Sequence, residues 1–140
     1  MTTIRIAAAA LLLAFGSSAQ AQMVAAVSAA DSPKAYKLDA AQHIYRHYAP
    51  QIFKGKLPPL VHAIVVCETE VDADGHVRDV KMIRVPTHAP DVTARVREMI
   101  RKASPMPAPS RLGGAVKFME VWLVDKSGRF QLDTLTEGQL

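Results

Sequence analysis

The sequence predicts an α+β fold, an antiparallel sheet of three to four strands with helices packed on one face. The expected order is helix, strand, strand, helix, strand, strand. Val61 to Asp72 has one apolar face at a period of two, as a strand requires. The Asp74-Gly75 pair that follows favours a tight hairpin turn. Asp91 to Ala103 repeats apolar residues at helical spacing, which predicts an amphipathic helix over the sheet.

The composition sets limits on function. The 140 residues are typical of one domain, and 49% hydrophobic with 21% charged residues is a globular balance. Aromatic residues make up only 6% and the net charge is +4, so we expect no nucleic-acid partner. The single cysteine excludes an internal disulfide and any cysteine-cluster metal site.

The first residues have the features of a signal peptide. Arg5 gives a positive start, Ile6 to Phe15 is an apolar run, and Ala19-Gln20-Ala21 fits the small-x-small cleavage rule. A transmembrane helix needs about 20 apolar residues, more than this run offers. We therefore expect residues 1–21 to be removed after Ala21 and the protein to be periplasmic, with no stable membrane anchor. An uncleaved anchor is the alternative.

Residues 22–38 are rich in alanine and serine and predict a flexible leader. The domain is then expected to span 39–140. Asp39 is a plausible N-cap for a helix over Ala40 to Ala49, and Pro50 should end it. The apolar stripe of this helix is expected to comprise Ile44, Tyr45, Tyr48 and Ile52.

The hairpin should return through Val77 to Val85. The alternation of that strand slips, which predicts a bulge near Lys81-Met82. Before the second helix, Thr87 or His88 can act as the cap, and Pro90 suits the first turn. On this helix the side chains expected to be buried are Val92, Val96, Met99, Ile100 and Ala103.

The last third of the chain predicts a loop and two strands. Ser104 to Gly114 has prolines at alternate positions, so we expect an extended loop over the surface. Val116 to Val124 has two apolar faces, typical of a strand buried in the middle of a sheet. Asp125 to Gly128 predicts a turn, and Arg129 to Leu135 a fourth strand.

The hairpin from Val71 to Val77, followed by Val80, a helix and the Pro-Met-Pro-Ala-Pro loop, resembles the C-terminal domain of the TonB family. That family shows an aliphatic–Asp–x–x–Gly–x–Val hairpin, then a helix, then a proline-containing loop that leads into a strand. The match covers roughly Tyr45 to Val124. The resemblance implies a non-catalytic protein-interaction module of the cell envelope. The chain lacks the long proline-rich spacer of a TonB protein, because residues 22–39 are too few.

The resemblance also implies a mode of binding. The family pairs its third strand with an extended peptide from an outer-membrane receptor, which is β-augmentation. Here we expect the fourth strand to fill that edge, leaving Val77–Val85 and Arg129–Leu135 for an envelope protein, a peptide or a second copy in a homodimer. The candidate partner-binding residues are Val77, Arg78, Val80, Arg129, Gln131 and Asp133.

Few residues suggest chemistry. His43 and His47 lie one helical turn apart, a spacing that can hold a metal, and the alternative function is a small periplasmic metal-dependent or hydrolytic factor that uses them. Cys67 falls on the apolar strand face and predicts a buried, inert thiol. We expect no enzyme and no cofactor.

Charged residues gather in two places. Glu68, Glu70 and Asp72 share a strand face, where ion pairs with the returning strand are expected and a carboxylate acid/base pair is the alternative. The second helix carries a basic patch, which either meets an acidic partner or is an ordinary solvated face. That patch comprises Arg95, Arg97, Arg101 and Lys102.

Overall fold

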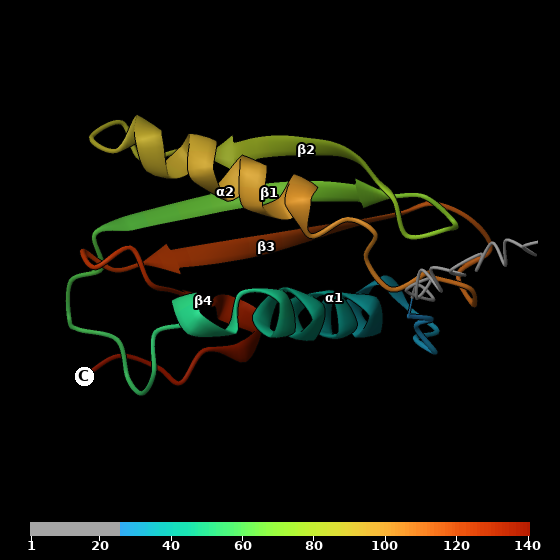
Figure 1. The fold of residues 1–140 in the computed structure, drawn as a ribbon, viewed down its shortest axis with the longest axis horizontal. Coiled ribbons are helices and arrows are strands. Elements are labelled where there is room, and N and C mark those ends of the chain that lie inside the picture. The colour runs from blue at the N-terminus through green and yellow to red at the C-terminus, as the bar shows by residue number, and fades with distance from the viewer. Residues whose placement is uncertain (1–25) are drawn as a thin grey trace, which may run out of the picture.

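One antiparallel sheet carries the fold of residues 26–140, the part of the chain that the computed structural model describes (Figure 1). The four strands run in the order β2-β1-β3-β4, and all neighbours are antiparallel. The predicted α+β class with an antiparallel sheet is confirmed. The predicted signal peptide and its cleavage after Ala21 lie outside the described residues. The strands are β1 (Ala63–Val71), β2 (Val77–Arg84), β3 (Val116–Val124) and β4 (Phe130–Leu132).

The helices α1 (Pro33–His47) and α2 (Pro90–Lys102) pack on one face of the sheet. Figure 1 shows α2 along β1 and β2 and α1 along β3 and β4. Short 3₁₀ helices follow α1 at Ala49–Gln51 and β4 at Asp133–Leu135. Trp122 stacks on Phe130, with 4.6 Å between ring centroids, and this pair joins β3 to β4 in the core.

The first helix begins earlier than predicted. Its N-cap is Ser32, whose hydroxyl accepts a hydrogen bond from the Ala35 amide at 3.2 Å, whereas Asp39 lies inside the helix. The predicted flexible leader is therefore wrong for residues 33–38, which are helical, and Tyr36 is fully buried. Alanine forms much of the inner face, so the apolar stripe contrasts weakly with its surroundings. The helix ends at His47, before Pro50 but two residues short of the predicted end at Ala49, so Tyr48 and Ile52 of the predicted stripe lie beyond it.

The predicted hairpin is confirmed. Alternate residues of β1 are buried, from Ala63 to Val71. In β2 one register shift leaves Ile83 unmatched, next to the predicted bulge, and a second leaves Arg78 unmatched.

The second helix is confirmed, with its predicted apolar stripe buried. Pro90 lies in its first turn, but the predicted caps are wrong. The residue before the helix is Ala89, and no side chain bonds to its first amides. His88 donates from Nε2 to the carbonyl of His62 at 2.6 Å instead.

The third strand has the predicted limits and lies inside the sheet. It is buried on one face only, because the helices cover only that face, and Met119 on the other face is 47% exposed. The fourth strand is shorter than predicted. Its ladder ends at Leu132, where the chain turns into a 3₁₀ helix.

The proline loop, Ser104–Gly114, is not confined to the surface as predicted. Met106 is fully buried, and Pro107 and Pro109 are buried as well. Residues 26–28 run beside the loop, where Val27 forms a bridge with Ala108 and the Ser28 amide donates to the Ala108 carbonyl at 2.9 Å. The start of the described chain therefore covers part of this loop.

Candidate functional site

β2 is the outermost strand on one side of the sheet. Its inner side pairs with β1, and within residues 26–140 no other strand lies on its outer side. Alternate residues of an edge strand turn backbone N–H and C=O groups outward, where they can pair with another chain. This edge is the candidate interaction site.

The predicted partner-binding residues of β2 differ in what they can offer. Val80 is buried and belongs to the core, and Val77 is half-buried with its amide bonded to the Ser104 hydroxyl at 3.0 Å. Arg78 is exposed, but its guanidinium is engaged by Asp72. Its Nε and Nη2 lie 2.7 and 2.6 Å from Asp72 Oδ2. The side chains open to a partner on this strand are the exposed Asp79, Lys81, Ile83 and Arg84.

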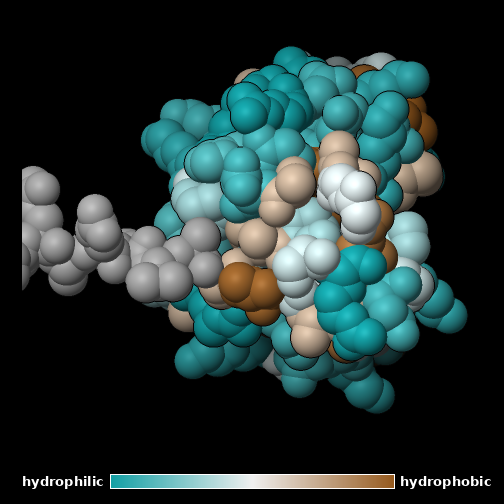
Figure 2. All heavy atoms as spheres, turned by 90° about the vertical axis from the view of Figure 1, so that its right-hand side faces the viewer, coloured by the Kyte–Doolittle hydropathy of each residue, from teal (hydrophilic) through white to brown (hydrophobic). Residues whose placement is uncertain are grey.

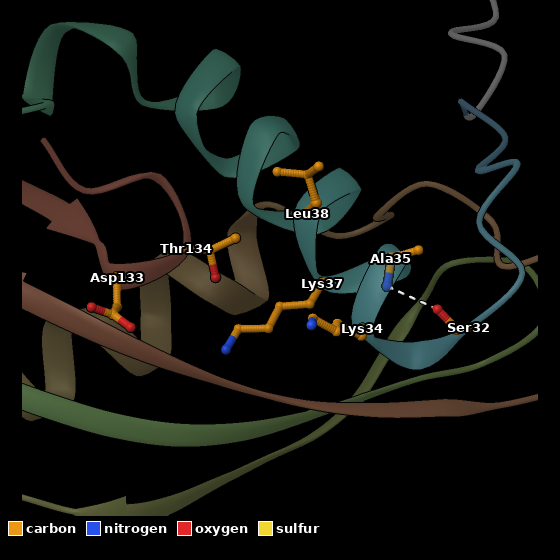
Figure 3. A pocket seen from close by; sticks show the side chains of 7 residues that line it. All are labelled: Ser32, Lys34, Ala35, Lys37, Leu38, Asp133 and Thr134. Carbon is orange, nitrogen blue, oxygen red and sulfur yellow. Dashed lines mark hydrogen bonds between the residues drawn. The ribbon is translucent and has the colours of Figure 1, made fainter.

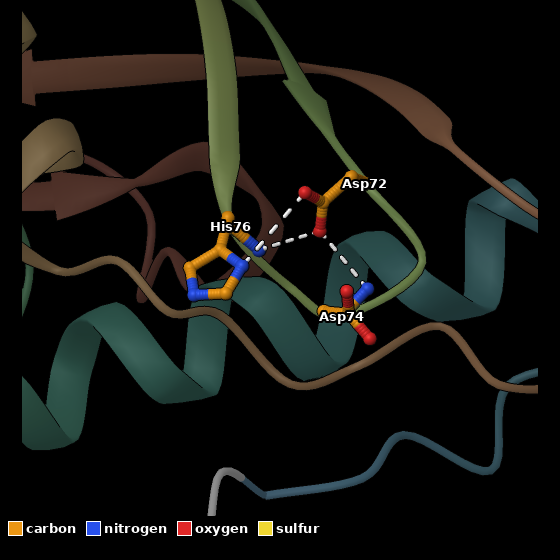
Figure 4. Close-up of side chains that lie close together, drawn as sticks. All are labelled: Asp72, Asp74 and His76. Carbon is orange, nitrogen blue, oxygen red and sulfur yellow. Dashed lines mark hydrogen bonds and ion pairs between the residues drawn. The ribbon is translucent and has the colours of Figure 1, made fainter.

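The turn before β2 is organised by Asp72 (Figure 4). Its Oδ1 accepts hydrogen bonds from the amides of Asp74 at 2.9 Å and His76 at 3.0 Å. Desolvation raises the pKa of this carboxyl, but these amides together with Arg78 outweigh that effect and hold its pKa below the ordinary value. The Asp72 carboxylate therefore stabilises the turn between β1 and β2. Asp72, Asp74 and His76 lie close enough to share a cation, but their contacts are those of an ordinary Asx turn.

The second predicted edge, β4, is not free. The Phe53 amide donates to the Phe130 carbonyl at 2.9 Å, and Ile52 forms a parallel bridge with Phe130. Gln131 is 1% exposed, and its amide group donates to the carbonyls of Phe53 at 2.9 Å and Gly55 at 2.7 Å. The prediction that Gln131 binds a partner is wrong, because returning segments of the chain already occupy its polar atoms.

Two further predicted partner-binding residues, Arg129 and Asp133, lie directly before and after β4. Arg129 and Asp133 are exposed, but Asp133 lies in the 3₁₀ helix and not on a strand. Arg129 lies in the turn before β4, and Asp133 follows Leu132, the last residue that pairs with β3.

The third strand is covered by β4 over three residues only. The pairs run from Trp122 opposite Leu132 to Val124 opposite Phe130. The expectation that the fourth strand fills the whole edge of β3 is therefore met only at this end. Further along, the Val121 amide bonds to the Glu120 carboxylate at 2.9 Å in place of a strand partner.

Glu120 is a buried acid that the sequence analysis did not single out. It is 3% exposed, on the same strand face as Phe118 and Trp122. Its Oε2 accepts a hydrogen bond from the Thr134 hydroxyl at 2.6 Å. Burial raises the pKa of this carboxyl, opposed by the hydrogen bonds from Thr134 and Val121 and by the charge of Lys37. The sequence could have indicated that Glu120 is buried, because it alternates with apolar residues on the buried face of the strand.

A cavity of about 510 Å³ lies between α1 and the 3₁₀ helix Asp133–Leu135, beside Thr134 (Figure 3). Lys34, Lys37 and Asp133 border it and give it a mixed charge. Leu38 and Ala35 supply an apolar wall. Both hydroxyls that line it are hydrogen-bonded, since that of Ser32 accepts from the Ala35 amide and that of Thr134 donates to the Glu120 carboxylate.

Within the described residues, the structure brings no third possible ligand to the pair of His43 and His47. The ring centroids of His43 and His47 are 6.2 Å apart, and the only cluster of three or more possible ligands lies at the β1–β2 turn. His43 donates from Nε2 to the Ala103 carbonyl at 2.7 Å, which ties α1 to the end of α2. Burial lowers the pKa of His43, opposed by this hydrogen bond.

Cys67 is 1% exposed, as predicted for a buried thiol. Burial, together with the nearby Glu120, raises the pKa of its thiol to about 12. Thiolate chemistry needs a lowered pKa and access, so neither condition is met.

The basic patch is smaller than predicted. Arg95 is half-buried, and its guanidinium donates to the Gly128 carbonyl at 2.8 Å and to Gln51 at 2.9 Å. Lys102 pairs with Glu98 at 2.8 Å. Arg97 and Arg101 are exposed and remain as the open cations of α2.

The end of the molecule that carries the β1–β2 turn is largely hydrophilic, with apolar side chains in separate spots (Figure 2). Among residues 26–140, no helix has the length and apolar character that a membrane crossing requires.

Comparison of the chain with protein-family models, with curated proteins and with solved structures found no match.

Proposed function

We propose that this protein is an exported, periplasmic interaction module of the cell envelope, which resembles the TonB C-terminal domain and binds an extended protein segment along the outer edge of β2. The observation that carries this proposal is the free position of β2 in the order β2-β1-β3-β4. Its role is non-catalytic and requires no cofactor.

Backbone pairing would supply the binding energy. An added strand forms main-chain hydrogen bonds with the edge, and its alternate side chains set the specificity. Asp79, Lys81 and Arg84 would select a segment with charges of both signs, because β2 itself carries both.

Three features support the resemblance to the TonB family. The Asp of the hairpin pattern is Asp72, which organises the turn, and the Gly is Gly75, which has φ +93°. The helix α2 and the proline loop then lead into β3, in the order that the family shows. The pairing of β4 with Trp122–Val124 separates this chain from a domain whose third strand is open along its length.

Site-specific photocrosslinking in cells that express the full chain tests the function. A photoreactive residue in place of Lys81 should give a discrete conjugate in the periplasmic fraction, with a second protein or with a second copy. The same residue in place of Arg97, exposed on α2, is the matched control and should give none. If Lys81 and Arg97 give the same diffuse products, β2 is not a binding edge.

A further inference from the structure

The charges on β2 complement a second copy of β2. In an antiparallel pair of identical strands related by a two-fold axis at Val80, Asp79 of each copy lies opposite Lys81 of the other. Residues opposite each other in such a pair point to the same face of the sheet. We propose, on the basis of the function proposed above, that the occupant of this edge is a second copy of the chain, joined through β2 about this axis.

The other close registers are less favourable. An axis at Lys81 would place Lys81 opposite itself and Arg78 opposite Arg84. An axis at Asp79 would place that carboxylate opposite itself. Like charges directly opposite are destabilising, so electrostatics favours the axis at Val80.

Within one copy, Asp79 lacks a cation. It lies opposite Glu70 of β1, and Glu70 turns to Lys117 of β3 at 3.6 Å. No ion pair within residues 26–140 includes Asp79 or Lys81. The Lys81 of a second copy would therefore bring a positive charge to a carboxylate that faces another carboxylate.

The axis also fits the regular part of the strand. The register shifts of β2 lie at Arg78 and Ile83, and Asp79 to Met82 between them is regular. A two-fold axis at Val80 places the pairs of Asp79 with Lys81 inside this stretch. The shifts at both sides limit the ladder to a few residues, so the dimer should dissociate on dilution.

A charge exchange tests the register. Asp79→Lys alone and Lys81→Asp alone each convert two attractive pairs into two repulsive ones, and each should weaken the dimer by on the order of tenfold. The double variant restores opposite charges and should recover the affinity of the parent chain. The dimer constant is measured by sedimentation, and circular dichroism confirms that each variant folds.

Matched controls carry the same charge changes elsewhere. Asp31→Lys and Lys126→Asp alter exposed residues away from β2 and should leave the dimer constant unchanged. Disulfide trapping gives a second readout that does not depend on charge. A mixture of Asp79→Cys and Lys81→Cys chains should form a mixed disulfide more readily than either chain alone.

The outcomes separate this inference from the proposed function. A parent chain that stays monomeric, while Lys81 in cells crosslinks to a different protein, overturns the dimer and leaves the function standing. A dimer that is unchanged by both single charge variants also overturns it. If the chain is monomeric and Lys81 crosslinks to nothing, both proposals fail.

Discussion

Gly75 is constrained twice, by its own backbone and by a neighbouring segment. Its φ is +93°, and a Cβ built there would lie 2.0 Å from the carbonyl oxygen of Met106. The Met106 amide also donates to the Gly75 carbonyl at 2.7 Å. The turn and the proline loop therefore approach so closely that only glycine fits between them.

Gly75→Ala should lower the free energy of unfolding by more than about 3 kcal/mol, because a left-handed backbone costs roughly 1–2 kcal/mol and the overlap adds to it. Gly55→Ala is the matched control, since Gly55 has φ +84° and nothing within 4 Å. It should lose only about 1 kcal/mol. Urea denaturation measures both, and equal losses would contradict the role of Met106.

Glu120 makes stability depend on pH. Burial holds its pKa above the ordinary 4.5, so the folded chain retains a proton that the unfolded chain has released. The contribution of this group to stability therefore falls as the pH rises from the unfolded pKa through the folded pKa.

Glu120→Gln should stabilise the protein at pH above this window, and its advantage over the parent chain should shrink as the pH falls toward about 4. Urea denaturation across this range measures the difference. Glu68→Gln, on the half-exposed opposite face of the sheet, is the control. A Glu120→Gln variant that is less stable than the parent at every pH would show that the ionised carboxylate is needed.

At the scale of elements, β4 is held by side-chain hydrogen bonds more than by its ladder. It has only three residues, and Gln131 bonds to four surrounding groups. Gln131→Ala should cost about 2–4 kcal/mol, because the variant loses a fully buried side chain together with its four hydrogen bonds. Gln139→Ala, which also removes two bonds to carbonyls but at an exposed position, should cost less than about 1 kcal/mol. Thermal denaturation distinguishes these outcomes. Similar losses for the two variants would show that the hydrogen bonds of Gln131 add little to stability.

Sequence periodicity correctly predicted those elements whose two faces differ strongly in hydrophobicity. The limits of β3 and the stripe of α2 follow directly from alternating or helical apolar residues. The start of α1 was missed because Ala40 and Ala41 are small and the buried residue nearest the start is the lone Tyr36. The end of β4 was missed because contacts distant in sequence, those of Gln131 with residues 53–55, decide it.

The candidate site was predictable only in part. The hairpin pattern predicted β2 as a strand and the order of elements left it at an edge, so Arg78 and Val80 were placed on the correct element. Whether a second edge is free depends on where residues 52–57 return, and no local pattern encodes that position. Glu120 could have been noticed, because it lies in phase with Phe118 and Trp122.

For the whole molecule, the domain begins well before the boundary at 39 that composition predicted. Tyr36 packs against Phe118 with 5.7 Å between ring centroids, and its hydroxyl donates to the Pro107 carbonyl at 2.8 Å. Ser28 is buried, and its hydroxyl donates to the Asp39 carboxylate. The segment before 39 thus joins α1 to the proline loop and β3.

A chain that begins at Asp39 should therefore lose most of its stability. Deleting a buried aromatic side chain alone costs about 3–5 kcal/mol, and whole domains are stable by only about 5–15 kcal/mol. The expected result is a broad thermal transition with weak near-ultraviolet circular dichroism. A chain that begins at Gln22, the start expected after cleavage, is the control and should melt cooperatively. If both chains melt at the same temperature, the contacts of Tyr36 contribute little and the shorter boundary is the true one.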